Sequence, residues 1–190
     1  EGRTVPAGAC WSGGNHLHPH YERAFEQAFE CEVYERYATM ETGLIAHDCV
    51  EERSLHVPAE GMIVEIVKPD GTWAGPGERG DVLITLLHNT ATPLIRYRIG
   101  DMAVAPERLD CACGRGLPVF GRVAGRTKDF LRTGDGGWLS PGEAVDAVDP
   151  GRNSVIDFQV VQKADRNMDI LVVQRDDASA EADRAAVVET

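Results

Sequence analysis

Between residues 50 and 125, short runs of alternating side chains are separated by turns rich in glycine and proline. In the run 62–67, Met62, Val64 and Ile66 alternate with a second set of side chains that includes Glu65, and this period of two is typical of a strand. The turn-rich segment PDGTWAGPGERGD then leads to a second expected strand at 82–87, and a third is expected at 95–99. Because no helical period interrupts this region, we expect a small antiparallel sheet or barrel there.

The flanking regions have a different pattern. A helix is expected to begin at Pro19, because Tyr21, Phe25 and Phe29 recur every fourth residue and form one apolar stripe. We expect this stripe to pack on a core. A polar turn is expected at 37–43.

The end of the chain has strand patterns at 155–161 and 170–173 and a helical pattern at 178–188. A chain of 190 residues can form one or two domains with a sizeable core. Together with the sheet expected at 50–125, these patterns predict a mixed fold of strands and helices.

The charge balance excludes some functions. The chain has 19 Lys and Arg against 31 Asp and Glu, a formal net charge of −12, and no run of basic residues. Nucleic acids and anionic membrane surfaces are bound through clustered cations, so neither partner is expected. No apolar run has the roughly 18 residues of a membrane span, and no signal peptide is visible. We therefore expect a cytoplasmic protein.

The number of cysteines is odd. Five cysteines do not suit a disulfide framework, so reduced thiols are the better interpretation. Cys49, His56 and the pair Cys111 and Cys113 offer three thiolates and one imidazole, which is a donor set for structural zinc. Their spacing alone is a weak signal, since buried free cysteines are common. The spacing alone therefore does not decide between a zinc site and buried free cysteines.

Three blocks, in this order, resemble a known family. They are YERYATMETGLIAHDC at 34–49, TPLIRYRIGDM at 92–102 and CACGRGLPVFGRVAGRTKDFLRTGDGGWLSP at 111–141. Together they closely resemble the second half of phenylacetate–CoA ligase-like enzymes, a branch of the adenylate-forming superfamily. Each block alone would be a weak motif, but their occurrence in order is specific.

The resemblance implies the architecture. Its fold class is α+β with α/β: residues 1–126 would be the end of a nucleotide-binding α/β domain, with a small distorted antiparallel β-barrel at about 50–125. Residues 127–190 would begin a small, mobile α+β C-terminal domain. The chain lacks an initiator Met, the family's upstream phosphate-binding loop and its downstream lysine. We therefore expect a piece of a longer enzyme that does not turn over by itself.

The resemblance also implies an activity. Family members activate a carboxylic acid with ATP and Mg²⁺ as an acyl-adenylate, which a thiol such as CoA then attacks. A carrier-protein thiol or an amine acceptor stays open, as does a homodimer. The implied partners are therefore an aryl or acyl carboxylic acid, ATP and a thiol.

By resemblance, five residues would contact the nucleotide or its metal. Glu41 matches the carboxylate that holds Mg²⁺, and Tyr37 matches the aromatic residue that lies against adenine. Asp101 matches the carboxylate that accepts hydrogen bonds from both ribose hydroxyls. Arg126 matches an arginine that contacts the nucleotide, and Thr39 would substitute for a hydroxyl that the family carries just before the glutamate.

Lys128 matches the residue about which the superfamily rotates its C-terminal domain. Some members also bind structural zinc through a cysteine, a histidine and a CxC pair, which Cys49, His56, Cys111 and Cys113 match. The chain departs from the family at Ala38, where glycine is usual, and at Met40, where Ser or Thr is usual. These departures favour the alternative hypothesis that the protein is a non-catalytic binding or scaffold module that keeps the fold and the zinc.

Overall fold

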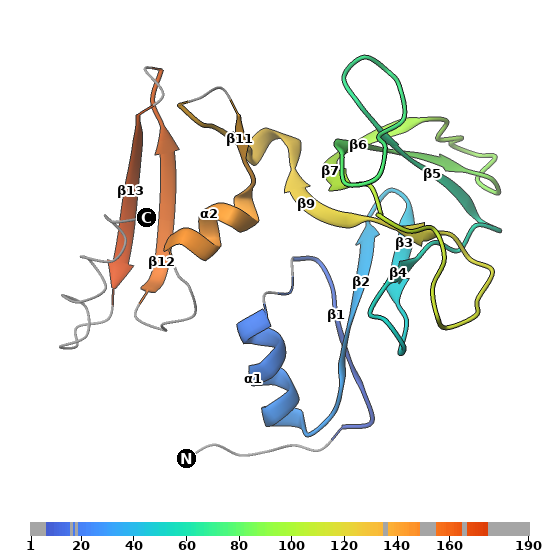
Figure 1. Cartoon of the computed structure of the whole chain (residues 1–190). Helices are drawn as coiled ribbons and strands as arrows, with labels where there is room; N and C mark the ends of the chain where they lie inside the picture. Colours follow the sequence, from blue (N-terminus) through green and yellow to red (C-terminus); the bar gives the residue numbers. More distant parts are fainter. Residues whose placement is uncertain are drawn as a thin grey trace. The chain divides into compact units, whose positions relative to one another are not determined.

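The computed structural model describes residues 7–15, 17, 19–134, 137–148, 155–164 and 167–174. The chain divides into two units, Glu1–Thr127 and Lys128–Thr190, which are described separately (Figure 1). Strands predominate and the described residues form two α-helices, which confirms the α+β class. The helix expected at 178–188 lies outside the described residues.

The first unit is built mainly of strands. They are β1 (Cys10–Ser12), β2 (Val33–Thr39), β3 (Gly43–Asp48), β4 (Leu55–His56), β5 (Met62–Val67), β6 (Arg79–Leu86), β7 (Tyr97–Val104), β8 (Val119–Phe120) and β9 (Arg122–Arg126). One sheet has the order β1-β2-β3-β4-β8 and the other the order β5-β6-β7-β9. Only β1 and β2 pair in parallel; the remaining pairs of these two sheets are antiparallel.

The expected barrel is not closed in the described part of the chain, where both sheets stay open. The chain passes from one sheet to the other at Gly121, because β8 pairs with β4 whereas β9, one residue later, pairs with β7. A Cβ atom at Gly121 would lie 1.7 Å from the Val104 carbonyl oxygen, so only glycine allows this close approach. After this sharp corner the chain pairs with β7 of the second sheet, instead of continuing the first sheet around a closed barrel.

The two sheets share one core. Its centre is formed by side chains with no measurable exposure, among them Ile45 on β3 and Val82 and Ile84 on β6. Phe120 on β8 and Ala103 on β7 complete the contact between the sheets. The strands predicted at 62–67 and 82–87 are present as the antiparallel pair β5–β6.

The polar turn predicted at 37–43 is wrong in its first half, because β2 continues to Thr39. Tyr37 pairs with Ala46 of β3, whose side chain is fully buried in the core. Pairing with a buried strand therefore keeps the backbone extended where local composition favours a turn. The strand predicted at 95–99 begins two residues later, at Tyr97.

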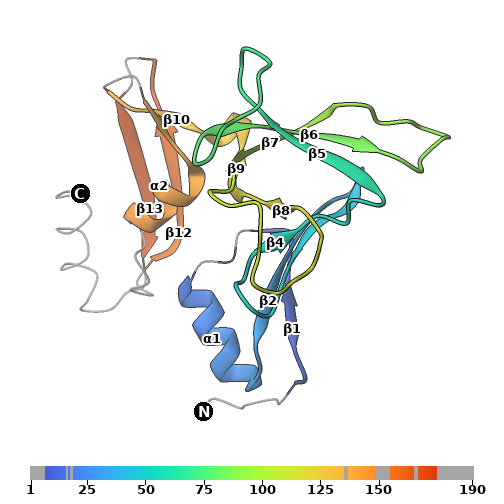
Figure 2. The ribbon, with the colours of Figure 1, turned by 45° about the vertical axis from the view of Figure 1, so that its right-hand side comes forward.

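Helix α1 (Pro19–Phe29) has the bounds that its periodicity predicts, and it lies beside β2 in both ribbon views (Figures 1 and 2). The helix ends at Phe29, and the next residue, Glu30, adopts a left-handed φ of 51°. Its apolar stripe is less buried than expected, since Tyr21 is 49% exposed and Phe25 is 42% exposed. The prediction that this stripe packs on a core is therefore only partly met by the residues described.

The second unit contains two small antiparallel pairs and one helix. They are β10 (Leu131–Arg132) with β11 (Trp138–Leu139), α2 (Pro141–Val148), and β12 (Val155–Gln162) with β13 (Met168–Gln174). The strands predicted at 155–161 and 170–173 are confirmed with slightly wider bounds. Helix α2 begins with a capping box, in which the Ser140 hydroxyl accepts from the Glu143 N–H and the Glu143 carboxylate accepts from the Ser140 N–H. Neither described helix is long and apolar enough to cross a bilayer.

Candidate functional site

Tyr37 lies where the two sheets of the first unit meet. It is on β2, and its ring stacks on Phe120 of β8 with the centroids 5.4 Å apart and an interplanar angle of 23°. Its hydroxyl donates a 2.6 Å hydrogen bond to Oδ2 of Asp101 on β7. Burial, this hydrogen bond and the charge of Asp101 raise the pKa of Tyr37 far above its usual value, so the phenol stays neutral.

Asp101 is the central carboxylate of this cluster. Only 5% of the residue is exposed, and its Oδ1 lies 3.1 Å from Nε of Arg126. The two residues face one another across the β7–β9 ladder, where Asp101 is the register partner of Arg126. Arg126 also donates from Nη1 to the Ile99 carbonyl at 3.0 Å. Three strands from two sheets therefore hold Tyr37, Asp101 and Arg126 in one hydrogen-bonded chain.

Thr39 and Glu41 occupy the tip of the β2–β3 hairpin. The Thr39 hydroxyl lies 2.9 Å from the Thr42 hydroxyl and accepts from the Thr42 N–H at 3.3 Å. Gly43 closes the turn with a left-handed φ of 72°. Glu41 is exposed, and Met40 beside it is 98% exposed. The hairpin thus presents a carboxylate to solvent at the end of the strand that carries Tyr37.

Lys128 is the first residue of the second unit and lies in a short 3₁₀ helix, Thr127–Asp129. Its side chain is exposed. The preceding residue is anchored, because the Thr127 hydroxyl donates to Oδ1 of Asp81 at 3.2 Å. Asp81 is buried on β6 and also accepts a hydrogen bond from Arg98. Thr127 is therefore held to β6 by its side chain, and the exposed Lys128 follows it directly at the boundary of the two units.

A second cluster is formed by Cys49, His56, Cys111 and Cys113. Their ligand atoms all lie within 4.8 Å of one another. The Sγ atoms of Cys49 and Cys111 are 3.5 Å apart, and the Cys113 Sγ is 3.5 Å from Nε2 of His56. In a tetrahedral zinc site with bonds of about 2.3 Å to sulfur, ligand atoms lie roughly 3.5–3.8 Å apart. The donor set and its spacing therefore fit zinc.

The orientation of His56 also suits a ligand. The residue is fully buried on β4, and its Nδ1 lies 3.2 Å from the Leu117 carbonyl oxygen. A proton on Nδ1 leaves the Nε2 lone pair free to face the three thiols, which is the usual arrangement for a metal-binding histidine. Gly114 allows the chain to turn back after the cysteine pair, with a φ of 71°.

The thiols of this cluster differ in acidity. Burial alone would raise the pKa of Cys49, but hydrogen bonds from the backbone at Glu52 and Ser54 and from neighbouring side chains lower it to about 6. A backbone hydrogen bond lowers the pKa of Cys111, but partial burial and hydrogen bonds with Cys113, Cys49 and Glu52 raise it to about 11. A metal ion binding here must therefore displace protons, which makes its affinity fall as the pH falls.

Sequence reasoning missed Phe120 and Asp81. Phe120 backs the Tyr37 ring from another part of the chain, and no local motif indicates that contact. Asp81 lies in the strand pattern RGDVLITL. Because a carboxylate is rarely buried without a partner, its place in an apolar strand could have indicated a buried, paired group.

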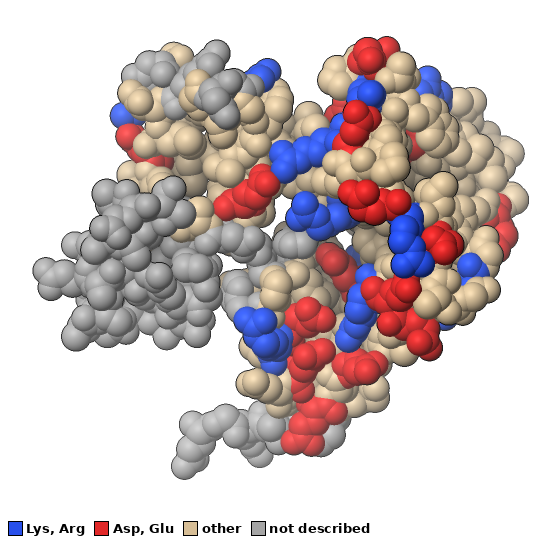
Figure 3. All heavy atoms as spheres, viewed as in Figure 1, with Lys and Arg blue, Asp and Glu red and all other residues tan. Residues whose placement is uncertain are grey.

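The surface charges form no continuous basic area on the face in Figure 3, where Lys and Arg side chains are interspersed with Asp and Glu.

We compared the chain with protein-family models, solved structures and curated proteins. No protein-family model matches the chain. Over 90% of its length it superposes on 2-hydroxyisobutyryl-CoA ligase in complex with an acyl-AMP, with a TM-score of 0.70 and 21% identity. It superposes over 95% of its length on an anthranilate CoA ligase in complex with anthranoyl-AMP, with a TM-score of 0.68 and 18% identity. The fold is thus that of the adenylate-forming CoA ligases.

Sequence similarity defines a narrower relationship. The chain is 36% identical over 89 residues to the phenylacetate-coenzyme A ligase of Thermus thermophilus, a stretch covering 46% of this chain and 20% of that enzyme. The resemblance to the phenylacetate–CoA ligase-like branch is therefore confirmed: the chain is a relative of these ligases. It spans about a fifth of the curated relative and 37% of either solved structure.

Proposed function

We propose that the chain is part of an ATP-dependent acid–CoA ligase, and that the cluster of Tyr37, Asp101 and Arg126 is its nucleotide-binding site. The geometry of this cluster carries the proposal. A buried carboxylate with one neighbour on each oxygen retains further lone pairs for two ribose hydroxyls. Tyr37, held on Phe120, offers an aromatic surface to the adenine ring, and exposed Arg126 offers a cation to the phosphates.

In the proposed reaction, a carboxylate oxygen of the substrate acid attacks the α-phosphorus of ATP, and pyrophosphate leaves. A thiol sulfur then attacks the acyl carbon and AMP leaves. The residues of this chain would hold the ribose and adenine so that the attacking oxygen is in line with the leaving group. Glu41, exposed at the hairpin tip, would bind the Mg²⁺ that neutralises the phosphate charges.

The acid class follows from the relatives. The phenylacetate-coenzyme A ligase of Thermus thermophilus is named for an acid with an aryl group, so we favour an aryl acid as substrate and CoA as acceptor. We propose that a structural zinc ion is held by Cys49, His56, Cys111 and Cys113. We also propose that the first unit, which ends at Thr127, is the end of the large domain and that the second unit is the beginning of a mobile domain.

The test is ATP–pyrophosphate exchange by the full-length protein that contains this chain, with phenylacetate, benzoate and an aliphatic acid compared. We expect exchange that depends on an aryl acid and on Mg²⁺, and a loss of at least tenfold for Glu41→Gln. Glu60→Gln, which alters an exposed carboxylate near the start of β5, is the matched control and should leave exchange unchanged. Equal exchange by Glu41→Gln and the wild type would remove Glu41 from the site.

Met40 favours a second candidate, a non-catalytic module of the same fold. Its side chain is 98% exposed at the position where the family carries a hydroxyl beside the glutamate. The same assay separates the candidates, since a non-catalytic module would bind nucleotide without exchanging pyrophosphate for any acid.

Lys128→Pro should separate the two half-reactions of the full-length protein. Proline fixes φ near −65° and so restricts the residue about which we propose the second unit to rotate. We expect pyrophosphate exchange to stay within about threefold of the wild type while thioester formation falls by about tenfold or more. Lys128→Ala, which keeps the backbone freedom, is expected to retain both activities.

Thermal melts of both variants are needed to exclude unfolding. Equal loss or equal retention of the two activities in a folded Lys128→Pro protein would contradict the hinge assignment.

A further inference from the structure

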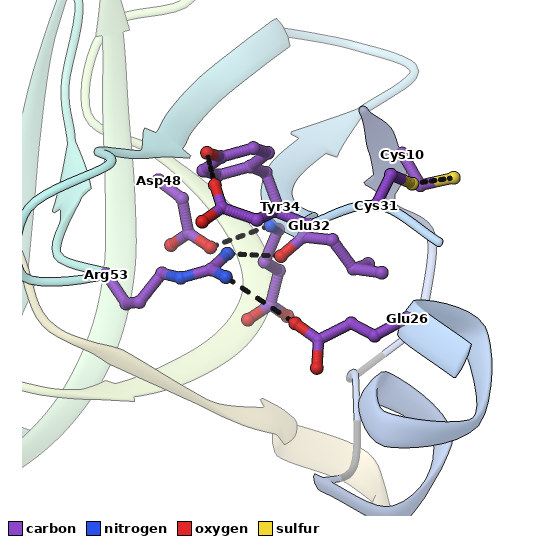
Figure 4. Close-up of polar contacts among 9 residues, drawn as sticks. Cys10, Glu26, Cys31, Glu32, Tyr34, Asp48 and Arg53 are labelled. Atoms are coloured by element: carbon purple, nitrogen blue, oxygen red, sulfur yellow. Dashed lines mark hydrogen bonds and ion pairs between the residues drawn. The ribbon is translucent and has the colours of Figure 1, made fainter. Parts of the chain in front are cut away.

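Two cysteines outside the sites described above lie in contact. Cys10 begins β1 and Cys31 follows α1, and their Sγ atoms are 3.3 Å apart, with Cys31 as the hydrogen-bond donor (Figure 4). Both residues are half-buried, so small oxidants can reach them. Neither belongs to the four-residue metal cluster or to the nucleotide-binding cluster.

The backbone on both sides holds the two sulfur atoms together. The Cys10 N–H donates to the Glu32 carbonyl at 3.0 Å, and Cys10 is the register partner of Val33 in the parallel β1–β2 pair. One residue further on, the Trp11 and Tyr34 rings lie 5.4 Å apart. Cys31 lies two residues before Val33, so the contact between the sulfurs lies directly beside the end of this strand ladder.

A nearby ion pair ties the same segment to the rest of the unit. Arg53 lies 3.7 Å from Glu26 of α1, donates to the Val33 carbonyl and lies over the Tyr34 ring at 4.6 Å (Figure 4). Helix α1 and the start of β2 are thereby fixed against each other on either side of Cys31.

We infer that Cys10 and Cys31 form a reversible disulfide bond when the protein meets a peroxide, which makes this pair a redox modification site. A disulfide requires an S–S distance of about 2.0 Å, so the sulfurs must approach by roughly 1.3 Å. Small rotations of two half-exposed side chains can provide that approach.

The chemistry balances with one peroxide molecule. The Cys10 thiol loses its proton and its sulfur attacks one peroxide oxygen; the O–O bond breaks, leaving a sulfenic acid and a hydroxide that takes up the proton as water. The Cys31 sulfur then attacks the sulfenic sulfur; the S–O bond breaks, and the oxygen leaves as a second water with the Cys31 proton. Two thiols lose two electrons and one peroxide gains them.

The order of attack follows from the surroundings. Partial burial, the hydrogen bond to Cys10 and the nearby Glu26 carboxylate raise the pKa of Cys31. Cys31 also directs its proton at the Cys10 sulfur, which leaves Cys10 as the acceptor of the pair and the sulfur that attacks peroxide first.

The bond would link β1 to the chain that enters β2, the strand carrying Tyr37, and would enclose α1 in a covalent loop. Closing a loop of this length restricts the unfolded chain, so the oxidised form should be the more stable one. We expect its melting temperature to be several degrees higher than that of the reduced form.

Peptide mapping tests the inference on this chain. Protein freed of reductant is treated with hydrogen peroxide, its remaining thiols are alkylated, and it is digested with trypsin. Cleavage after Arg3, Arg23 and Arg36 places Cys10 in peptide 4–23 and Cys31 in peptide 24–36. We expect these two peptides joined, at a mass lower than their sum by two hydrogens, and separated again by dithiothreitol.

The other three cysteines fall in peptides 37–53 and 109–115, so other pairings are visible in the same map. Cys10→Ser and Cys31→Ser are the matched variants, and neither should show the rise in melting temperature on oxidation. In Cys31→Ser, Cys10 should be trapped by a sulfenic-acid probe. Recovery of 4–23 and 24–36 as separate alkylated peptides, or joined no more often to each other than to 37–53 and 109–115, would overturn the inference.

Discussion

Replacing Cys111 by serine is expected to remove zinc and stability together. The wild-type chain, purified without chelator, should carry about one zinc ion, as a closed four-ligand site does. Cys111 lies 3.5 Å from Cys49 in a loop far along the chain, so the ion would join that loop to the end of β3. Because such a site is not preformed in the unfolded chain, its binding energy is folding energy. We expect a destabilisation above about 4 kcal/mol, the range of mutations that remove a metal site.

Elemental analysis and thermal melts, made in reductant, check this expectation. Cys31→Ser is the matched control, because it removes a half-buried thiol outside the cluster and should keep both the zinc and most of the stability. A chelator should reproduce the effect of Cys111→Ser on the wild type. Zinc should also be lost as the pH falls, because protons compete for the thiolates. Wild-type protein without zinc would contradict the proposed site.

Asp101→Asn is expected to weaken AMP binding by about 100-fold or more. The substitution keeps the shape but removes the charge that Tyr37 and Arg126 contact and that we propose the ribose hydroxyls contact. A hydrogen bond to a charged group is worth about 1.5–3 kcal/mol, so weakening two of them costs roughly 3 kcal/mol or more. Isothermal titration calorimetry of this chain with AMP measures the loss directly.

Glu65→Gln provides a closely matched control. Glu65 is a buried carboxylate, and its Oε2 lies 3.1 Å from Nε of Arg96, the same distance as in the pair of Asp101 and Arg126. The two variants should lose similar stability, but only Asp101→Asn should lose affinity for AMP. A parallel loss of affinity in both variants would show that Asp101 acts through folding alone.

Local pattern was sufficient for some elements. The four-residue spacing of Tyr21, Phe25 and Phe29 predicts α1 to within its observed bounds. A period of two predicts β5, and an apolar run after a turn-rich segment predicts β6. These signals succeed because a helix or strand that buries one face must repeat its apolar residues with its own period. The pattern also misses elements: β1 has only three residues and acquires its structure by pairing with β2.

The candidate residues came from motifs that the chain shares with its relatives. Tyr37, Asp101 and Arg126 were identified in separate blocks, and no local pattern states that they touch. Asp101 meets Arg126 because β7 pairs with β9, and Tyr37 reaches Asp101 because the sheet containing β2 encloses the same core. The roles of all these residues stay predictions, as do those of Glu41, Thr39 and Lys128 and the zinc ion at the cysteine cluster.

Short stretches of chain are enough to predict the periodic elements, the relationship to the ligases and the residues able to do the chemistry, because each of these properties is local. Which of those residues meet is visible only in the folded chain, since it depends on contacts between distant segments. The chain turns from one sheet into the other at Gly121, where only a missing side chain allows the approach to Val104. The contacts of Cys31 with Cys10 and of Phe120 with Tyr37 likewise exist only because strand pairing joins segments remote in sequence.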